Sequence, residues 1–426
     1  MTTTTPRPSP ALRRAAVAAL VALSPSAAHA GSFALFEPGA SGLGRAGASL
    51  TQAADAACLA YNPALIALLR SRQLSLGAAA FSDTASFAAD GATRELGKRQ
   101  FIIPPGVFYT HRLSERLVVG AGVGEPFGFK TAWAEPESFS GRFLAQRASL
   151  ESHVVTPAVA YRLADRLAFG AGLDVRFSRL TLDRRVGARL NNVVMDAAEL
   201  RIATSRTVDV GFHLGLLVKP APDLSFALVY RHGGNVSASG NGRFELLPTG
   251  QADADAAIAR VLPAGNVPTT VAVALPSHVG AGAAYERGDW TVEADAAWYR
   301  WSAVRGIPIA FEGRDDLSGT IPLSYADAWQ ARLGVERALF TSWKARAGYF
   351  FEQSPAPSAT LSPFLPDGNR HGVAVGAAWS SPRLRFDAGA FYAFSPARAN
   401  ADGTQGYAGT YQTSKVGAAL SLGFVF

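Results

Sequence analysis

The sequence is short of charge and of cysteine, and beyond its first thirty residues it has no long apolar run. Charged residues make up 17% of the 426 residues, whereas soluble domains have roughly 25%. A membrane-spanning helix needs about 20 consecutive apolar residues, and no such run follows residue 30. A helical membrane protein is therefore excluded. The single cysteine, Cys58, excludes an internal disulfide, and we expect it to be a small buried apolar side chain.

The first thirty residues have the pattern of a secretory signal peptide. Three arginines precede an apolar stretch at residues 15–23, and the Ala-His-Ala sequence at residues 28–30 predicts cleavage between Ala30 and Gly31. A net charge of +7 would suggest nucleic-acid binding in a cytoplasmic protein, but an exported protein does not meet nucleic acid in that compartment. The basic residues are scattered, and no nucleic-acid-binding motif accompanies them. We therefore expect no nucleic-acid partner, and arginines that are solvated, lumenal or facing lipopolysaccharide.

Alternation with a period of two residues indicates the fold class. Even positions from Trp290 to Trp298 are apolar, whereas Glu293 and Asp295 between them are charged. In residues 167–177 the odd positions are apolar and the even positions are small or polar. A helix would spread such residues around its circumference, so both segments are predicted to be strands with one lipid-facing and one wet face.

Fourteen segments alternate in this way. They are residues 73–82, 101–111, 117–124, 153–163, 166–178, 207–219, 224–232, 279–287, 289–301, 327–338, 343–351, 371–380, 384–394 and 415–426. Long and short connectors follow one another in turn, which predicts an all-β fold: a 14-stranded antiparallel transmembrane β-barrel over residues 73–426, with short periplasmic turns and long external loops. In the longest internal loops, residues 179–206 and 233–278, we expect short helices at 193–198 and 256–262.

The last strand ends at Phe426, which resembles the C-terminal signature that the barrel assembly machinery recognises in bacterial outer-membrane proteins. The predicted location is the outer membrane of a Gram-negative cell. Outer-membrane lipid and lipopolysaccharide are the expected surroundings, and a monomer is the expected state.

Residues 31–72 precede the barrel and do not alternate. They are apolar and punctuated by glycine, so they need a place to be buried. A barrel of fourteen strands encloses a water-filled channel unless something fills it. We therefore predict that residues 31–72 form an N-terminal hatch that plugs the lumen.

Several motifs resemble the FadL/TodX family of outer-membrane transporters for long-chain fatty acids and aromatic hydrocarbons. SGLGRA at residues 41–46, Asp55 in an alanine-rich tract and NPAL at residues 62–65 follow the signal peptide in the family's order. Further similar segments are PFGF at 126–129, LP at 275–276, Trp298 with Trp301 and Ser302, SPAP at 354–357 and PDGNR at 366–370. The resemblance spans the mature chain and implies a 14-stranded barrel with an N-terminal hatch.

The resemblance also implies a mechanism. Ligand would enter an apolar groove among the external loops, pass to a deeper pocket and leave sideways at a kink in strand three, by diffusion and without a cofactor. The residue that matches the pocket-lining N-terminal phenylalanine is Phe33. The residues that match the hatch and gating motif are Asn62, Pro63 and Ala64. The kink and lateral exit match Pro126, Phe127, Gly128 and Phe129, where proline lacks a ladder donor and glycine tolerates a bulge.

The resemblance places Leu182 as an apolar wall of the pocket and Arg184 as a carboxylate partner. Odd positions of residues 167–177 are predicted to face lipid, so these even positions should face the lumen. A guanidinium can hold a carboxylate through two hydrogen bonds, which favours a long-chain fatty acid as substrate. Ala326 stands where fatty-acid members of the family have a basic residue. Neutral aromatic hydrocarbons therefore stay open as substrates, and so does a solvated position for Arg184 at the base of a loop.

Other classes of protein find less support. The seven histidines are isolated, and the sequence has no His-Glu-x-x-His, Gly-x-Ser-x-Gly or CxxC motif. We therefore expect no catalytic residue and no metal site. A general porin would need an open lumen without an apolar hatch, and a purely structural or adhesive barrel is the last alternative.

Overall fold

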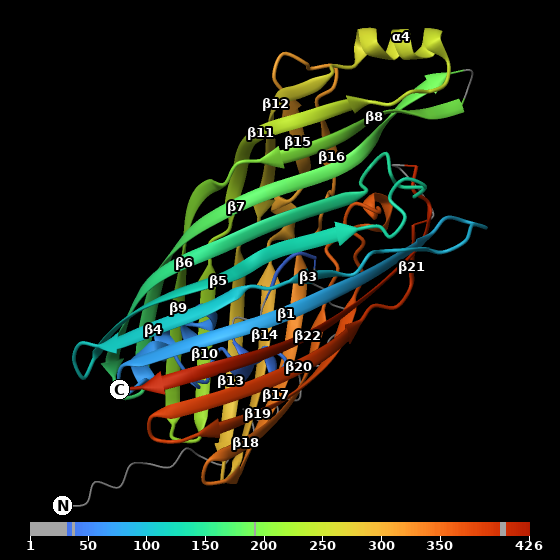
Figure 1. Cartoon of the computed structure of the whole chain (residues 1–426). Helices are drawn as coiled ribbons and strands as arrows, with labels where there is room; N and C mark the ends of the chain where they lie inside the picture. The colour runs from blue at the N-terminus through green and yellow to red at the C-terminus, as the bar shows by residue number, and fades with distance from the viewer. Residues whose placement is uncertain (1–31, 36–38, 191–192, 401–405) are drawn as a thin grey trace, which may run out of the picture.

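The computed structural model describes residues 32–35, 39–190, 193–400 and 406–426. Its strands form one sheet in which every pair of neighbours is antiparallel, and the sheet closes on itself as a barrel (Figure 1). Closure occurs where β1 (Gln73–Ala88) pairs with β22 (Gly409–Val425) along the whole length of β1. The predicted signal peptide lies outside the described residues.

The barrel has fourteen strands, as predicted, because several consecutive segments continue one another along the wall. The segments between β1 and β22 are β2 (Glu95–Leu96), β3 (Gln100–Ile102), β4 (Pro105–Arg112), β5 (Leu117–Ala132), β6 (Arg147–Ala164), β7 (Leu167–Leu190), β8 (Val193–Thr204), β9 (Thr207–Ala221), β10 (Leu224–Arg231), β11 (Gly234–Leu246), β12 (Gly265–Leu275), β13 (His278–Arg287), β14 (Trp290–Tyr299), β15 (Gly306–Phe311), β16 (Gly319–Pro322), β17 (Ala328–Phe340), β18 (Trp343–Glu352), β19 (Arg370–Ser380), β20 (Leu384–Phe394) and β21 (Arg398–Asn400). The continuing pairs are β2–β3, β3–β4, β8–β9, β10–β11, β12–β13, β14–β15, β16–β17 and β20–β21, which reduce the 22 segments to fourteen strands.

The helices within the described residues are few and short. They are α2 (Ala40–Leu43), α3 (Cys58–Tyr61), α4 (Ala252–Val261) and the 3-10 turns η1 (Pro63–Leu68), η2 (Trp301–Ala303) and η3 (Ser358–Thr360). In the described part of the chain no helix has the length and apolar character that crossing a membrane requires.

The two faces of the wall differ as the alternation predicts. Phe169 and Leu173 on β7 are 41% and 47% exposed on the outer face, whereas Asp174 and Arg176, at even positions farther along the same strand, are fully buried. The apolar side chains that belong to the outer face cover most strands, among them Leu76, Val107, Val159, Leu228, Leu333, Val375 and Leu420. The polar side chains of these strands therefore point mainly into the lumen.

Two of the expected external loops are largely strand. β7 continues to Leu190, and β8, β11 and β12 rise with it above the rest of the wall, with α4 at the tip (Figure 1). The predicted helix at residues 193–198 is wrong, because the backbone of this segment pairs with β7, and from Ala198 onward β8 also pairs with β11. The predicted helix at residues 256–262 is confirmed in part as α4, which has Asp253 and Asp255 in its first turn and Arg260 in its last, the favourable arrangement for the helix dipole.

Residues 40–69, here named the plug segment, lie on the inner side of the wall (Figure 1). α2 packs against β19, β20 and β22, and η1 packs against β5, β6, β7 and β9, so the two pieces contact opposite parts of the barrel. Cys58 in α3 is free and buried, as expected.

Candidate functional site

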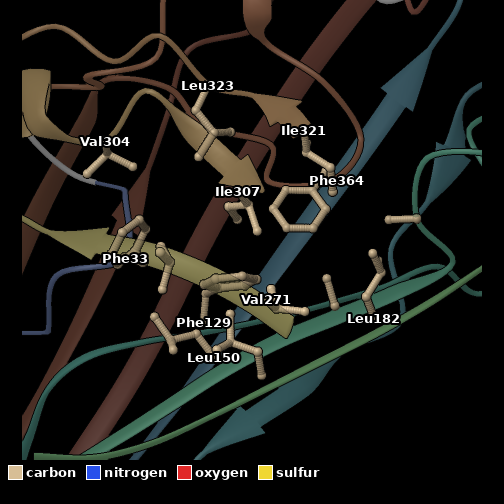
Figure 2. Packing of buried hydrophobic residues seen from close by; sticks show 14 of the residues in the cluster. Phe33, Phe129, Leu150, Leu182, Val271, Val304, Ile307, Ile321, Leu323 and Phe364 are labelled. Carbon is tan, nitrogen blue, oxygen red and sulfur yellow. The ribbon is translucent and has the colours of Figure 1, made fainter. Parts of the chain in front are cut away.

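An apolar cluster occupies the outer half of the barrel. Its side chains come mainly from β5, β6, β7, β8, β11, β12, β15 and β16 and from segments that connect strands, and Figure 2 shows part of the cluster. Its central members, here named the pocket cluster, are Phe33, Phe129, Leu150, Leu182, Val271, Val304, Ile307, Ile321, Leu323 and Phe364. Such a cluster offers a ligand an environment without charge, although the lumenal side chains of these strands nearer the periplasm are mainly polar.

Phe33 closes one side of the pocket cluster. Its side chain is only 1% exposed. Its ring lies edge-on to Trp301 at a centroid distance of 4.7 Å, and it also contacts Phe129 at 6.0 Å and Phe127 at 6.3 Å. Edge-to-face contacts of this kind stabilise by about 0.5–1.5 kcal/mol each beyond burial. The structure therefore brings Phe33 together with two of the predicted kink residues.

The kink in β5 interrupts the ladder. β5 pairs with β6 in register up to Gly124, and pairing resumes only at Phe127. Residues 32–35, here named the strap, follow the inner side of this bulge. The Leu35 N–H donates to the Pro126 carbonyl at 2.9 Å, and the Gly128 N–H donates to the Phe33 carbonyl at 2.9 Å. The strap thus uses backbone groups that the bulge leaves free.

On the other side of the kink, the wall between β4 and β5 has a gap in its hydrogen bonding. The last regular pair is Val107 with Val123. Farther toward the outer end of the two strands, the next bridge joins Gly97 to Trp133. A small, mainly apolar cavity lies next to this gap. Its apolar lining includes Leu35 of the strap, Leu59, Phe81, Pro104, Phe108 and Pro126, and its polar lining residues are Glu125, Thr156 and Arg231. The strap therefore lies between the pocket cluster and a weakly bonded part of the wall.

Leu182 and Arg184 both lie on the lumenal side of β7. Leu182 is 6% exposed and belongs to the pocket cluster. Arg184 is half-buried and stands directly opposite Leu200, which is fully buried in the same cluster. Within the described residues the Nε atom of Arg184 has no hydrogen-bond partner, and no ion pair involves its side chain. Burial raises the pKa of the neighbouring Tyr407 phenol, so this phenol stays neutral and does not neutralise the guanidinium.

Asn62, Pro63 and Ala64 lie away from the strap. The Asn62 amide caps η1 by accepting from the Ala64 N–H at 3.0 Å and donates to the Leu50 carbonyl at 2.8 Å. An added Cβ at Gly170 of β7 would run into Ala64, and one at Gly215 of β9 would run into Asn62. The motif therefore fits against two glycines of the wall, whereas the strap contacts the kink.

Charged residues that sequence reasoning left without a role hold the plug segment. Asp295 accepts from the Ser49 N–H at 2.8 Å and from the Leu50 N–H at 3.2 Å, and Glu293 accepts from the Thr51 N–H at 2.7 Å. Glu293 also faces the Arg45 guanidinium at 3.8 Å. The signal in the sequence was the pair of acidic residues on the wet face of one strand, but nothing there identified their partners.

A second unassigned residue holds the strap. Arg370, the last residue of the PDGNR motif, donates to the Ser32 carbonyl at 2.9 Å and pairs with Glu352 at 3.2 Å and Asp367 at 3.3 Å. Asp367 also accepts from the Ser354 hydroxyl at 2.9 Å. The motif therefore joins the start of the described chain to the external loop before β19.

Metal chemistry finds no support among the described side chains, where no group of three or more His, Cys, Asp or Glu residues is placed to hold an ion.

A closed barrel with an apolar outer face defines a transmembrane β-barrel protein. The family of outer membrane transport proteins designated OMPP1/FadL/TodX matches residues 20–426. The chain therefore belongs to this family, as the sequence motifs indicated, and is an outer-membrane transport protein.

Relatives and solved structures agree with this assignment. The long-chain fatty acid transport proteins of Salmonella typhi and Escherichia coli K12 are 24% and 23% identical, each over 86% of this chain and 88% of the relative. A FadL homologue from Pseudomonas aeruginosa is similar in structure with a TM-score of 0.79 at 18% identity, covering 93% of this chain and all of that one. The toluene transporter TodX of P. putida has a TM-score of 0.72 at 17% identity, covering 91% of this chain and 98% of its own. These likenesses support the fold.

Proposed function

We propose that this protein is a channel for passive uptake of long-chain fatty acids across the outer membrane. In this proposal residues 31–72 act as a hatch, the strap acts as a gate, and the ligand leaves sideways through the gap between β4 and β5. The observation that supports this proposal most directly is the position of the strap, which places Phe33 between the pocket cluster and the β5 kink and is held there by two backbone hydrogen bonds at the kink and by Arg370.

The route follows from desolvation. A fatty acid chain leaves water for the pocket cluster because burial of apolar surface is favourable by about 25 cal/mol per Å². Phe33 occupies part of that cluster, so a ligand that takes its place displaces the strap. The freed bulge at Pro126 then joins the pocket to the small cavity beside β4. No energy source or cofactor is required, since each step only exchanges one apolar contact for another.

Arg184 supplies the preference for an acid. Its buried guanidinium has an unused donor beside the apolar wall formed by Leu182. A carboxylate there would form a charge-assisted hydrogen bond, and such bonds stabilise by about 1.5–3 kcal/mol. The names of the curated relatives, long-chain fatty acid transport proteins, support the same substrate class.

The second candidate is uptake of neutral aromatic hydrocarbons by the same route. Ala326 gives the pocket no second cation, and its backbone N–H donates to the Pro355 carbonyl at 2.9 Å. Toluene transporters are among the similar structures. A general porin is disfavoured, since the plug segment is buried against the inner wall.

Arg184→Met distinguishes the two substrates. We expect about a tenfold weaker affinity for a long-chain fatty acid, from the loss of one charge-assisted bond, and unchanged uptake of toluene. The matched control is Arg179→Met, on the same strand but on its exposed outer face. Equal losses for the acid and the hydrocarbon in Arg184→Met would show that the guanidinium is not the carboxylate partner.

A further inference from the structure

Basic side chains gather at the end of the barrel that has the short turns, which is the periplasmic end in barrels of this class. Seven connections lie there: the segment before β1 and the six short turns. Their basic side chains, here named the basic rim, are Arg70, Arg72, Arg112, Arg116, Arg162, Arg166, Lys219, Arg287, Arg337, Lys344 and Arg383. The acidic side chains of the same connections are Glu115, Asp165, Asp223, Glu286 and Asp289.

The rim is the most positively charged part of the predicted mature chain. Eleven basic against five acidic side chains leave an excess of six positive charges. The whole sequence has an excess of seven, three of which belong to the arginines of the predicted signal peptide, so the chain from Gly31 onward has an excess of four. Each of the seven connections has at least one basic side chain in it or within four residues of it, so the charge surrounds the whole circumference. The remainder of the predicted mature chain has a small excess of negative charge.

Much of this charge is not used within the fold. Five of the eleven side chains are exposed and make no side-chain hydrogen bond, ion pair or ring contact within the described residues; they are Arg70, Arg72, Arg116, Arg287 and Arg383. By contrast, Lys219 pairs with Glu286 at 3.6 Å, and the guanidinium of Arg166 donates to the Pro220 carbonyl at 3.0 Å. The unpaired arginines are therefore free to bind an external anion.

Aromatic side chains lie just inside the rim and set its depth in the membrane. Trp290 and Trp343 are 47% and 48% exposed at the start of β14 and β18. The Arg337 guanidinium stacks over the Trp290 ring at 4.8 Å. Exposed tryptophans of membrane proteins concentrate at the level of the lipid headgroups, so the arginines beside them lie at the level of the phosphates.

We propose that the basic rim binds the phosphate groups of anionic glycerophospholipids in the inner leaflet of the outer membrane. Charge around the whole circumference fits a shell of lipids better than a protein partner, which would cover one side. Arginine also matches phosphate geometry, because its planar guanidinium donates two parallel hydrogen bonds. The rim thereby fixes the immersion depth of the barrel. This inference is independent of the transported substrate.

The test compares two quadruple variants of the full-length protein that remove the same charge. The rim variant is Arg72→Gln, Arg116→Gln, Arg287→Gln and Arg383→Gln. The control variant is Arg99→Gln, Arg189→Gln, Arg206→Gln and Arg260→Gln, four exposed arginines near the opposite end of the barrel. Native mass spectrometry would count the molecules of phosphatidylglycerol, phosphatidylcholine and lipid A bound to each, after a heat-modifiability gel has verified folding.

We expect the wild type to retain phosphatidylglycerol over phosphatidylcholine, less so as salt is raised, since screening weakens surface charge. The rim variant should retain it at least about threefold less well, and the control variant should behave as the wild type. Equal retention by rim and control variants would overturn the proposal. So would a rim-dependent preference for lipid A over phosphatidylglycerol, because lipid A belongs to the other leaflet. If the quadruple variant does not fold, the single variants Arg116→Gln and Arg287→Gln, compared with Arg206→Gln, provide the same comparison.

Discussion

The strap and the plug segment are neighbours in sequence, but the barrel holds them by different means. The strap is attached by backbone hydrogen bonds at the β5 bulge, by Arg370 and by ring contacts of Phe33. The plug segment is held by buried carboxylates of β14. It also approaches the wall so closely that an added Cβ at Gly376 would lie 2.7 Å from the Cα of Gly44.

This difference indicates which part can move. The hydrogen bonds of the strap can be replaced by bonds to water, and an apolar ligand can replace the Phe33 ring, so release of the strap has a small net penalty. Release of the plug segment would break the buried pair of Arg45 with Glu293 and the hydrogen bonds that Glu293 and Asp295 accept from its backbone, together with its close packing on the wall, so it has a much larger penalty. Under the proposed function, the strap is therefore the gate and the plug segment is a fixed floor.

The largest effect is expected from Glu293→Ala, which removes one of the carboxylates that hold the plug segment. Arg45, 3% exposed, would lose its facing carboxylate, and breaking a buried pair in this way costs about 3–5 kcal/mol. We expect a raised ion conductance in planar bilayers, together with a lower thermal unfolding temperature. Conductance as low as that of the wild type would mean that the carboxylates of β14 do not keep the lumen closed.

Phe33→Ala should have an intermediate effect, confined to the strap. Truncation of a buried phenylalanine costs about 3–5 kcal/mol of packing, here between Trp301 and the kink. We expect fatty acid uptake to fall several-fold while heat-modifiable mobility and ion conductance stay normal. Phe101→Ala, at an outer-face phenylalanine that is 56% exposed, is the control. Unchanged uptake in Phe33→Ala would remove the gating role from the strap.

The smallest effect is expected from Asn62→Ala. The change removes the cap of η1, worth about 1 kcal/mol, but leaves the charged anchors of the plug segment in place. A small decrease in thermal stability with unchanged uptake would agree with a fixed floor. A large loss of uptake would instead place the gate at residues 62–64, and the plug segment rather than the strap would then be the moving part.

The fold was predictable because alternation is a local property. Each strand shows its two faces within a few residues, as in residues 290–298, and the even count and the connector rhythm follow from repetition. The extent of the strands was less predictable. Residues 193–198 have no alternation that separates a strand from a helix, and they are strand because the long β7 offers them free backbone groups, which β11 adds to only at Ala198.

The sequence by itself determined the barrel, the wet and lipid-facing sides of its wall, and the separate character of residues 31–72. Family resemblance, with parity in the case of Arg184, also indicated Phe33 and Arg184 as pocket residues, and this stays a prediction. Only the tertiary structure decided which groups meet. Arg370 reaches the Ser32 carbonyl across 338 positions, and the basic rim collects charge that is scattered in the sequence. Such contacts depend on how the sheet closes. Closure brings together residues that are far apart in the sequence, and no local pattern around either residue identifies its partner.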